Sequence, residues 1–228
     1  MSPSPAADAN PSGGHGATHP GSGPVLQLLA SGLQMWVRQQ CEAIGSLEIR
    51  LEGSALALLQ GRLEGVRVLG RRVVYQGLRI ELVELHSAPI EVQMGRVLRG
   101  RGLRLEQPFQ IRGQLSFTAE GLSRSLACGQ WRRLGDGIGE ALLGISPLTE
   151  LRVRANRLVL AARGVGERGL IELAADVRAA DGSLEIRASE AAAEAARYLL
   201  PMDPNITITR AEIEAGMLQL HGEARVSP

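Results

Sequence analysis

The sequence contains no lysine, few aromatic residues and only two cysteines, and each shortage excludes a class of protein. Aromatic residues make up 3% of the 228 residues, so the chain has few side chains on which the bases of single-stranded nucleic acid stack. Cys41 and Cys128 permit at most one disulfide, and the sequence has no CxxC motif and no metal-ligand spacing, which excludes a disulfide scaffold and a zinc site. The apolar stretch 25–37 is interrupted by Gln27 and Gln34 and is shorter than the ~20 residues of a membrane-spanning helix.

All 25 basic residues are arginine, and the formal net charge is only +1. A guanidinium group binds phosphate oxygens in a bidentate manner, so the arginine bias is compatible with phosphate recognition. The alternative explanation is a GC-rich genome, which also favours the abundant Ala, Gly and Leu. Because no global positive field attracts nucleic acid, we expect no nucleic-acid partner.

The motifs that carry enzyme chemistry are missing. The sequence has no GxSxG nucleophile elbow, P-loop, HExxH or kinase signature. His86 and His221 each follow a leucine at the predicted end of a strand, a position typical of solvated or backbone-paired histidines. We therefore expect a protein that is not an enzyme, with no catalytic residue, no cofactor and no metal.

The two parts of the chain differ in composition. Residues 1–24 consist mainly of Pro, Gly, Ser and Ala, a composition that buries too little apolar surface to offset the entropy of ordering. We predict a disordered tail over 1–24 and a single domain over 25–228. The tail lacks the positive start and the apolar run of a secretory signal, so we expect a cytoplasmic or peripheral membrane location.

The hydrophobic periodicity predicts the order of secondary structure. Helical spacing occurs at 25–43, again at 119–144 as one or two helices bent at Gly129, and in an Ala-rich run from Ser189 to Leu200. Period-two alternation fills the intervals 47–117, 151–186 and 206–220, and Asp181-Gly182 between alternating runs predicts a hairpin. The fold class we predict is α+β, with one long, curved antiparallel sheet wrapped around amphipathic helices.

Charge is distributed unevenly along the chain. Residues 62–104 contain nine Arg and four Glu, whereas 164–228 contain six Arg and eleven acidic residues. In the predicted central helix, Trp131 stands beside Arg132 and Arg133, a combination that suits a membrane interface. Two alternatives stay open: the basic and acidic stretches pair with each other, or the basic 62–104 face binds a protein partner.

Three sequence blocks resemble the LmeA-like phospholipid-binding family of bacteria, in particular its cyanobacterial members. They are GRLEGVRV at 61–68, LRLEQPFQIRGQLSFTAEGLSRSL at 103–126 and LRVRANRLVL at 151–160. The resemblance implies a fold like that of the tubular lipid-binding proteins, with acyl chains held between a curved sheet and a helix. It also implies phospholipid or a membrane surface as the partner. Actinobacterial members look exported, whereas the start of this chain does not.

Together, the family resemblance and the aliphatic alternation lead to a site hypothesis: non-enzymatic binding of phospholipid or a related lipid in an aliphatic groove, at the periphery of a membrane. The predicted groove residues lie in the central helical region, and they are Leu122, Leu126, Trp131, Leu134, Ile138 and Leu142. The predicted headgroup or membrane contacts are Arg99, Arg101, Arg132 and Arg133. The alternative is a structural or adaptor protein with a packed core.

Overall fold

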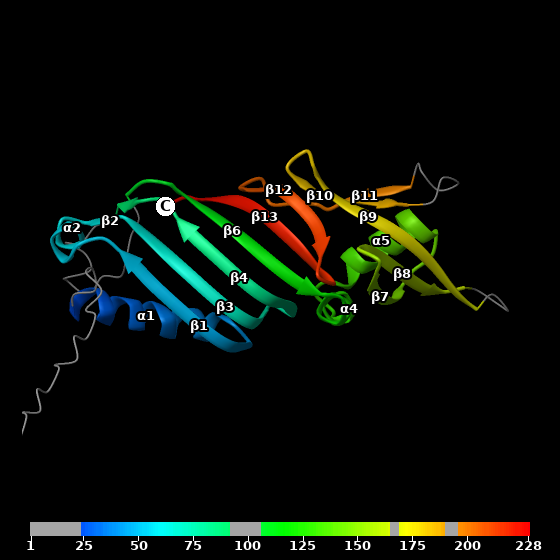
Figure 1. Ribbon diagram of the computed structural model, residues 1–228, viewed down its shortest axis with the longest axis horizontal. Helices are drawn as coiled ribbons and strands as arrows, with labels where there is room; N and C mark the ends of the chain where they lie inside the picture. The colour runs from blue at the N-terminus through cyan, green and yellow to red at the C-terminus, as the bar shows by residue number, and fades with distance from the viewer. Residues whose placement is uncertain (1–23, 92–105, 165–168, 190–195) are drawn as a thin grey trace, which may run out of the picture.

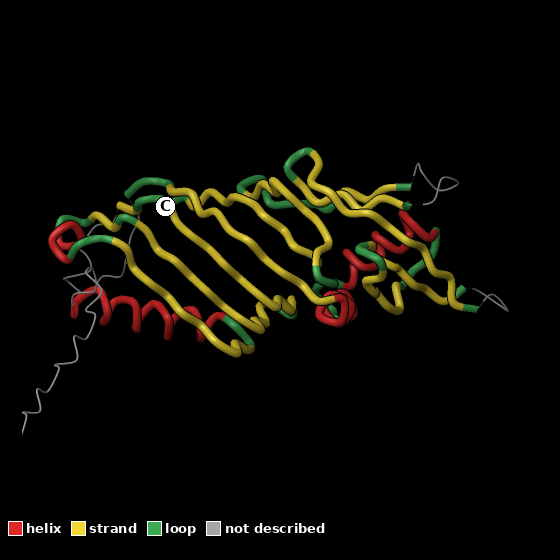
Figure 2. Tube along the Cα trace, viewed as in Figure 1, coloured by secondary structure: helices red, strands yellow, loops and turns green. Residues whose placement is uncertain are grey.

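The computed structural model describes residues 24–91, 106–164, 169–189 and 196–228. Its sheets are antiparallel and it contains a few helices, which confirms the α+β class. The molecule is elongated, with a larger sheet at one end and a smaller sheet at the other (Figure 1). Figure 2 shows that helix occurs mainly along one edge of the larger sheet and beside the smaller one.

The larger sheet has six strands. In spatial order they are β1 (Ala43–Glu52), β3 (Gly65–Tyr75), β4 (Leu78–Ser87), β6 (Phe109–Thr118), β13 (Met217–Val226) and β12 (Ile206–Glu214). Two-residue turns connect β3 to β4 and β12 to β13, and all four turn residues have positive φ. This geometry matches the twist of the flanking strands, so the pairing register is fixed locally.

The smaller sheet has five strands, in the order β11 (Arg197–Leu199), β10 (Ser183–Ala188), β9 (Leu170–Ala180), β8 (Arg157–Arg163) and β7 (Leu148–Arg154). The predicted Asp181-Gly182 hairpin is present, with both residues at positive φ. Strand β12 contacts β9 and β10, and Ile208 N donates a hydrogen bond to Gly182 O at 2.7 Å. The two sheets therefore meet at the edge strand of the larger one.

Two helices lie at the outer end of the larger sheet. Helix α1 (Pro24–Gln40) packs along β1, and α2 (Ala55–Leu59) follows that strand. Strands β2 (Arg62–Leu63) and β5 (Ile90–Glu91) form a separate two-stranded ribbon. Figure 1 shows α1 and α2 at the same end of the molecule, far from β11.

Helix α4 (Ala119–Ala127) forms hydrogen bonds with strands of both sheets, and α5 (Arg132–Leu143) follows it. Ser125 accepts a hydrogen bond from Arg79 N of β4, and Ser123 both donates to Leu151 O and accepts from Leu151 N of β7, each at 2.9 Å. Of the one or two helices predicted over 119–144, the structure has two, because α4 ends before Gly129 and α5 begins after it.

The structure overturns the prediction of one continuous sheet. Alternation identifies a strand but not its partners, because pairing depends on hydrogen bonds between distant segments. The predicted helix from Ser189 to Leu200 is also wrong where it can be checked: Arg197–Leu199 is strand β11, paired with β10. The edge of β10 supplies hydrogen bonds that outweigh the helical propensity of the alanines. The predicted tail, 1–24, lies almost wholly outside the described residues, and the single-domain prediction stays a prediction.

We expect the substitution of glycine by alanine to have opposite effects on stability at two helical positions. A Cβ at Gly32 of α1 would have nothing within 4 Å, whereas a Cβ at Gly139 of α5 would lie 2.6 Å from Ile145 O. We expect Gly32→Ala to raise the free energy of unfolding by about 0.5–1 kcal/mol, from helix propensity. We expect Gly139→Ala to lower it by about 1–3 kcal/mol, because backbone must move. Urea unfolding of both variants tests this, and stabilisation by both would contradict the packing at Gly139.

Candidate functional site

One of the two faces of the larger sheet carries aliphatic side chains on several neighbouring strands. Strand pairing places Ile49, Val68 and Leu85 in one cross-strand row, and a neighbouring row continues the same face over five strands. We call these rows the apolar face; its large side chains are Leu47, Ile49, Val68, Val83, Leu85, Leu115 and Leu220. Of these, only Ile49 is fully buried, and the other six are half-buried.

Small residues are interspersed with these aliphatic side chains. Gly70, Gly113 and Gly222 occupy positions in the same two rows. A Cβ at Gly113 would lie 2.4 Å from Leu85 Cδ2, so Leu85 lies over the space that the glycine leaves. The two rows contain no titratable side chain between β1 and β13, so their chemistry is that of a hydrocarbon surface.

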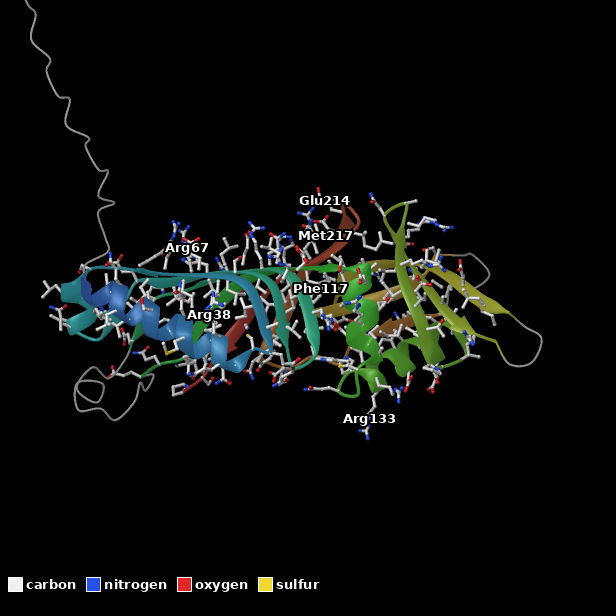
Figure 3. All side chains as sticks on the ribbon, turned by 90° about the horizontal axis from the view of Figure 1, so that it is seen from below. Arg38, Arg67, Phe117, Arg133, Glu214 and Met217 are labelled. Carbon is white, nitrogen blue, oxygen red and sulfur yellow. The ribbon has the colours of Figure 1, made fainter. Side chains whose placement is uncertain are left out.

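Helix α1 lies on the side of the sheet that carries the apolar face. In Figure 3 the helix is below the strands, whereas Arg67, which points from the opposite face, is above them. Leu26 of α1 is buried, and Leu29, Leu33 and Val37 are half-buried at helical spacing from it. The helix thus turns an aliphatic stripe inward next to β1.

The opposite face of the larger sheet is polar and hollowed. A hollow of about 720 Å³ is lined by residues of β1, β3, β4, β6 and β13 and by Thr209 of β12. A single cross-strand row brings together Arg50, Arg67, His86 and Arg112. Like charges in adjacent positions repel, and carboxylates on the same face offset them.

The carboxylates form ion pairs with this row. Glu52 pairs with Arg67 and lies 3.1 Å from His86 Nε2, and Arg112 pairs with Glu223 at 2.9 Å. Burial raises the pKa of Glu52, but hydrogen bonds and charges from His86 and Arg67 outweigh it and hold that pKa below its ordinary value. The cationic side chains of the hollow are therefore largely neutralised, which disfavours it as an anion site.

A smaller hollow of about 330 Å³ lies where β3, β4 and α4 meet. Its lining includes Arg72, Arg79 and Arg124, of which Arg124 pairs with Glu120. In the part of the chain that the structure describes, no group of three or more His, Cys, Asp or Glu is arranged to hold a metal ion.

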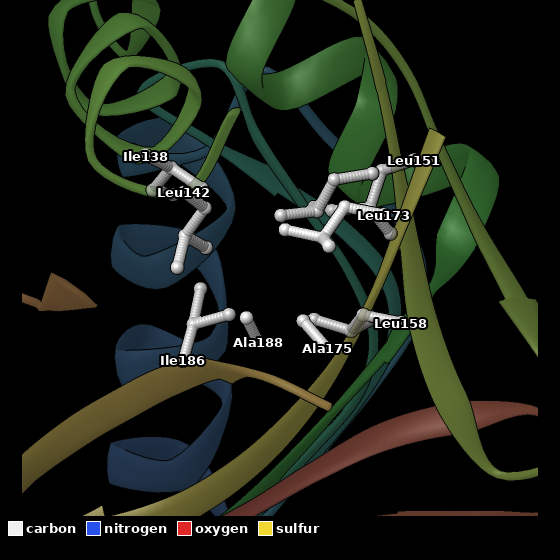
Figure 4. Close-up of a cluster of buried hydrophobic side chains, with 9 residues drawn as sticks. Ile138, Leu142, Leu151, Leu158, Leu173, Ala175, Ile186 and Ala188 are labelled. Atoms are coloured by element: carbon white, nitrogen blue, oxygen red, sulfur yellow. The ribbon is translucent and has the colours of Figure 1, made fainter. Parts of the chain in front are cut away.

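The predicted groove residues come together, but inside a packed core. Ile138 and Leu142 of α5 are buried in a cluster with side chains of β7 to β10. Leu122, Leu126 and Leu134 pack against that cluster. Figure 4 shows Ile138 and Leu142 directed toward Ile186 and Leu158. Because the two hollows have other linings, the groove role of these residues stays a prediction.

Trp131 and the predicted headgroup arginines are placed differently. Trp131 precedes α5, is half-buried and donates its indole N–H to Gln76 O in the β3–β4 turn at 2.8 Å. Arg132 and Arg133 are exposed and form no ion pair with the described residues. Arg133 points away from the sheets in Figure 3. Arg99 and Arg101 lie outside the described residues.

Comparison with known families identifies the chain. A family model described as LmeA-like phospholipid-binding matches residues 21–223. The chain belongs to the LmeA-like phospholipid-binding family. The resemblance that the sequence blocks carry is thereby confirmed, and membership in this family indicates a lipid as the partner. No curated protein and no solved structure matches the chain. Within the described residues, no helix is both long and apolar enough to cross a bilayer.

The described part of the basic 62–104 stretch, residues 62–91, does not form a single basic face. Arg67 is on the polar face and paired with Glu52, while Val66 and Val68 beside it point to the apolar face. Residues 92–105, which contain the densest arginines, lie outside the described residues. The aliphatic alternation predicted a sheet face that suits acyl chains, but the site residues predicted from sequence include none of the side chains of the apolar face. Alternation shows that such a face exists but not how much of it other elements cover. In the structure, Val83, Leu115 and Leu220 pack against a cluster that includes Leu184 of the smaller sheet, and six of the seven large side chains of the face stay half-buried.

Proposed function

We propose that this protein binds a phospholipid without catalysing a reaction, that the acyl chains lie along the apolar face beside α1, and that it acts at the periphery of a membrane. One observation carries the proposal: six of the seven large side chains of the apolar face, on five strands, are only half-buried by the described residues. Val83, Leu115 and Leu220 pack at one end against a buried cluster that includes Leu184 of the smaller sheet, and the rest of the face lies outside that cluster. An ordinary core face would be covered by a second layer. Family membership supplies the class of ligand.

The dimensions of the face fit an acyl chain. Strand β6 has ten residues and spans about 33 Å at ~3.3 Å per residue. One leaflet of a bilayer provides about 15 Å of hydrocarbon, so a phospholipid tail fits within the length of the sheet. Each buried CH₂ group contributes about 0.8 kcal/mol, and the lack of charge on the face means that no ion must be desolvated.

Binding rather than catalysis agrees with the side chains near the face. The two histidines within the described residues, His86 and His221, line the polar hollow on the other side of the sheet. A lipid on the apolar face is therefore separated from them by the sheet itself. Arg132 and Arg133 stay proposed headgroup contacts, because both are exposed guanidinium groups beside Trp131.

Native mass spectrometry tests the proposal. The purified protein is incubated with phosphatidylglycerol vesicles, separated from them and sprayed under non-denaturing conditions. We expect a species heavier by the mass of one phospholipid, and extraction with organic solvent should release an intact lipid. If only the mass of the lipid-free protein is observed, both before and after incubation, the proposal is contradicted and the packed-core adaptor is favoured. Release of lysolipid or free fatty acid would contradict the non-enzymatic part.

A further inference from the structure

Helix α1 is apolar over a wider sector than it buries. At 100° per residue, the buried stripe of Leu26, Leu33 and Val37 occupies one sector, and the apolar residues continue past it on one side only. This continuation, which we call the outer flank, contains Leu28, Met35 and Trp36, and its one polar side chain is Gln39 at the end of the helix. The other side of the helix is polar and carries Gln27, Ser31, Gln34 and Arg38.

The outer flank is exposed. The fractional exposures of Leu28, Met35 and Trp36 are 75%, 65% and 58%. Leu56 and Leu59 of α2 are also exposed, and α2 lies at the same end of the molecule as the start of α1 (Figures 1 and 3). Among the described residues, five of the nine exposed large hydrophobic side chains thus belong to these two helices. A concentration of this kind indicates an interaction surface.

The charges around the outer flank match a phospholipid bilayer. Neither α1 nor α2 contains an acidic residue, and Arg38 stands in the last turn of α1. A carboxylate would be repelled by anionic headgroups and costly to bury, whereas Arg38 reaches lipid phosphates from a helix that lies in the interface. Trp36 is two residues away, and tryptophan partitions to the headgroup level of bilayers.

We propose that the outer flank of α1, with the exposed leucines of α2, is the surface through which this protein docks on a phospholipid bilayer. The inference rests on the proposed function. Helix α1 turns its buried stripe toward the sheet that carries the lipid face and its outer flank toward solvent, so docking places this helix between bound lipid and bilayer. The Trp131 region is a weaker membrane contact, because the half-buried Trp131 ring is held by its hydrogen bond to Gln76 O.

Vesicle flotation tests the docking surface. The double variant Leu28→Ser/Met35→Ser is compared with wild type on vesicles of phosphatidylcholine and phosphatidylglycerol. Leu170→Ser/Leu199→Ser is the matched control, because both leucines are exposed and belong to the smaller sheet at the far end of the molecule. We expect at least about tenfold weaker vesicle binding for the α1 variant and less than about a twofold change for the control. Equal binding by both variants would overturn the proposal.

The two native tryptophans give a second test. Trp131→Phe leaves only Trp36, and Trp36→Phe leaves only Trp131. With vesicles of acyl-brominated phosphatidylcholine and phosphatidylglycerol, we expect the fluorescence of Trp36 to be quenched and that of Trp131 to change little. Quenching confined to Trp131 would overturn the proposal and favour the Trp131–Arg132–Arg133 surface. Concentration-dependent dimerisation abolished by Leu28→Ser/Met35→Ser, with flotation unchanged, would instead assign the flank to a second copy of the chain.

Failure of docking and failure of the proposed function give different results. Monomeric dihexanoyl phosphatidylglycerol, used below its micelle concentration, probes lipid binding without a bilayer. We expect Leu28→Ser/Met35→Ser to bind this lipid as wild type does while losing vesicles. A wild-type protein that binds vesicles but no monomeric lipid would contradict the proposed function and leave the docking surface intact.

Discussion

Leu85→Gln is expected to weaken phospholipid binding by a factor of about 10 to 100. Leu85 lies at the centre of the apolar face, between Val68 and Gly113 in the cross-strand row. Fully burying a leucine side chain contributes about 1.5–3 kcal/mol, and an amide placed under an acyl chain lacks a hydrogen-bond partner. A difference of 1.4 kcal/mol corresponds to a tenfold change in affinity. Titration with fluorescent phospholipid measures the effect.

Leu82→Gln is the matched control for this prediction. Leu82 belongs to the same strand, is also half-buried, and lies opposite Arg71 and Ser116 on the polar face. The substitution is chemically identical and differs only in the face that it changes. We expect less than about a twofold change in affinity for Leu82→Gln. Equal losses for both variants would show that the affinity reflects general damage to β4 rather than contact with the apolar face.

Ile138→Ala is expected to lower the free energy of unfolding by about 2–5 kcal/mol and to leave phospholipid affinity within about twofold of wild type. The side chain is only 3% exposed and belongs to the cluster between α5 and the smaller sheet. Truncating a buried isoleucine removes transfer free energy and leaves a cavity. Guanidinium unfolding measures the first quantity, and the same lipid titration measures the second.

The comparison between Ile138→Ala and Leu85→Gln separates two locations for the lipid. Arg133→Ala is the stability control on α5, because the side chain is exposed and forms no ion pair among the described residues, and we expect a change below about 0.5 kcal/mol. If lipid instead occupied the α4–α5 region, Ile138→Ala would weaken binding and Leu85→Gln would not. That pattern would support the lipid groove that the sequence predicts in the region of α4 and α5.

Local signals in the sequence predict much of this fold. The interruption between α4 and α5 and the turn at Asp181-Gly182 are determined by the residues at those positions. Both can therefore be predicted from the sequence. Strand β11 was not predictable, because its alanine-rich surroundings favour helix and only the edge of β10 makes it a strand. The division into two sheets depends likewise on β12 meeting β9 and β10, a contact between distant segments.

The candidate site was harder to predict than the fold. Helical spacing identified Leu122, Ile138 and Leu142 as an apolar stripe, but spacing does not distinguish a stripe that faces a ligand from one that faces a sheet. Conversely, Leu28 and Trp36 are apolar residues of the predicted helix 25–43, and the structure leaves both exposed. The exposure of a side chain depends on which other segments pack against it. The periodicity of one segment carries no information about those contacts.

Photochemical crosslinking most directly tests the claim that acyl chains lie on the apolar face. A phospholipid with a diazirine on its acyl chain is bound to the protein, irradiated and mapped after digestion at arginine. We expect adducts on the peptides of β3, β4, β6 and β13 and on α1. Adducts confined to residues 119–143, which form α4, α5 and the turn between them, would contradict this claim.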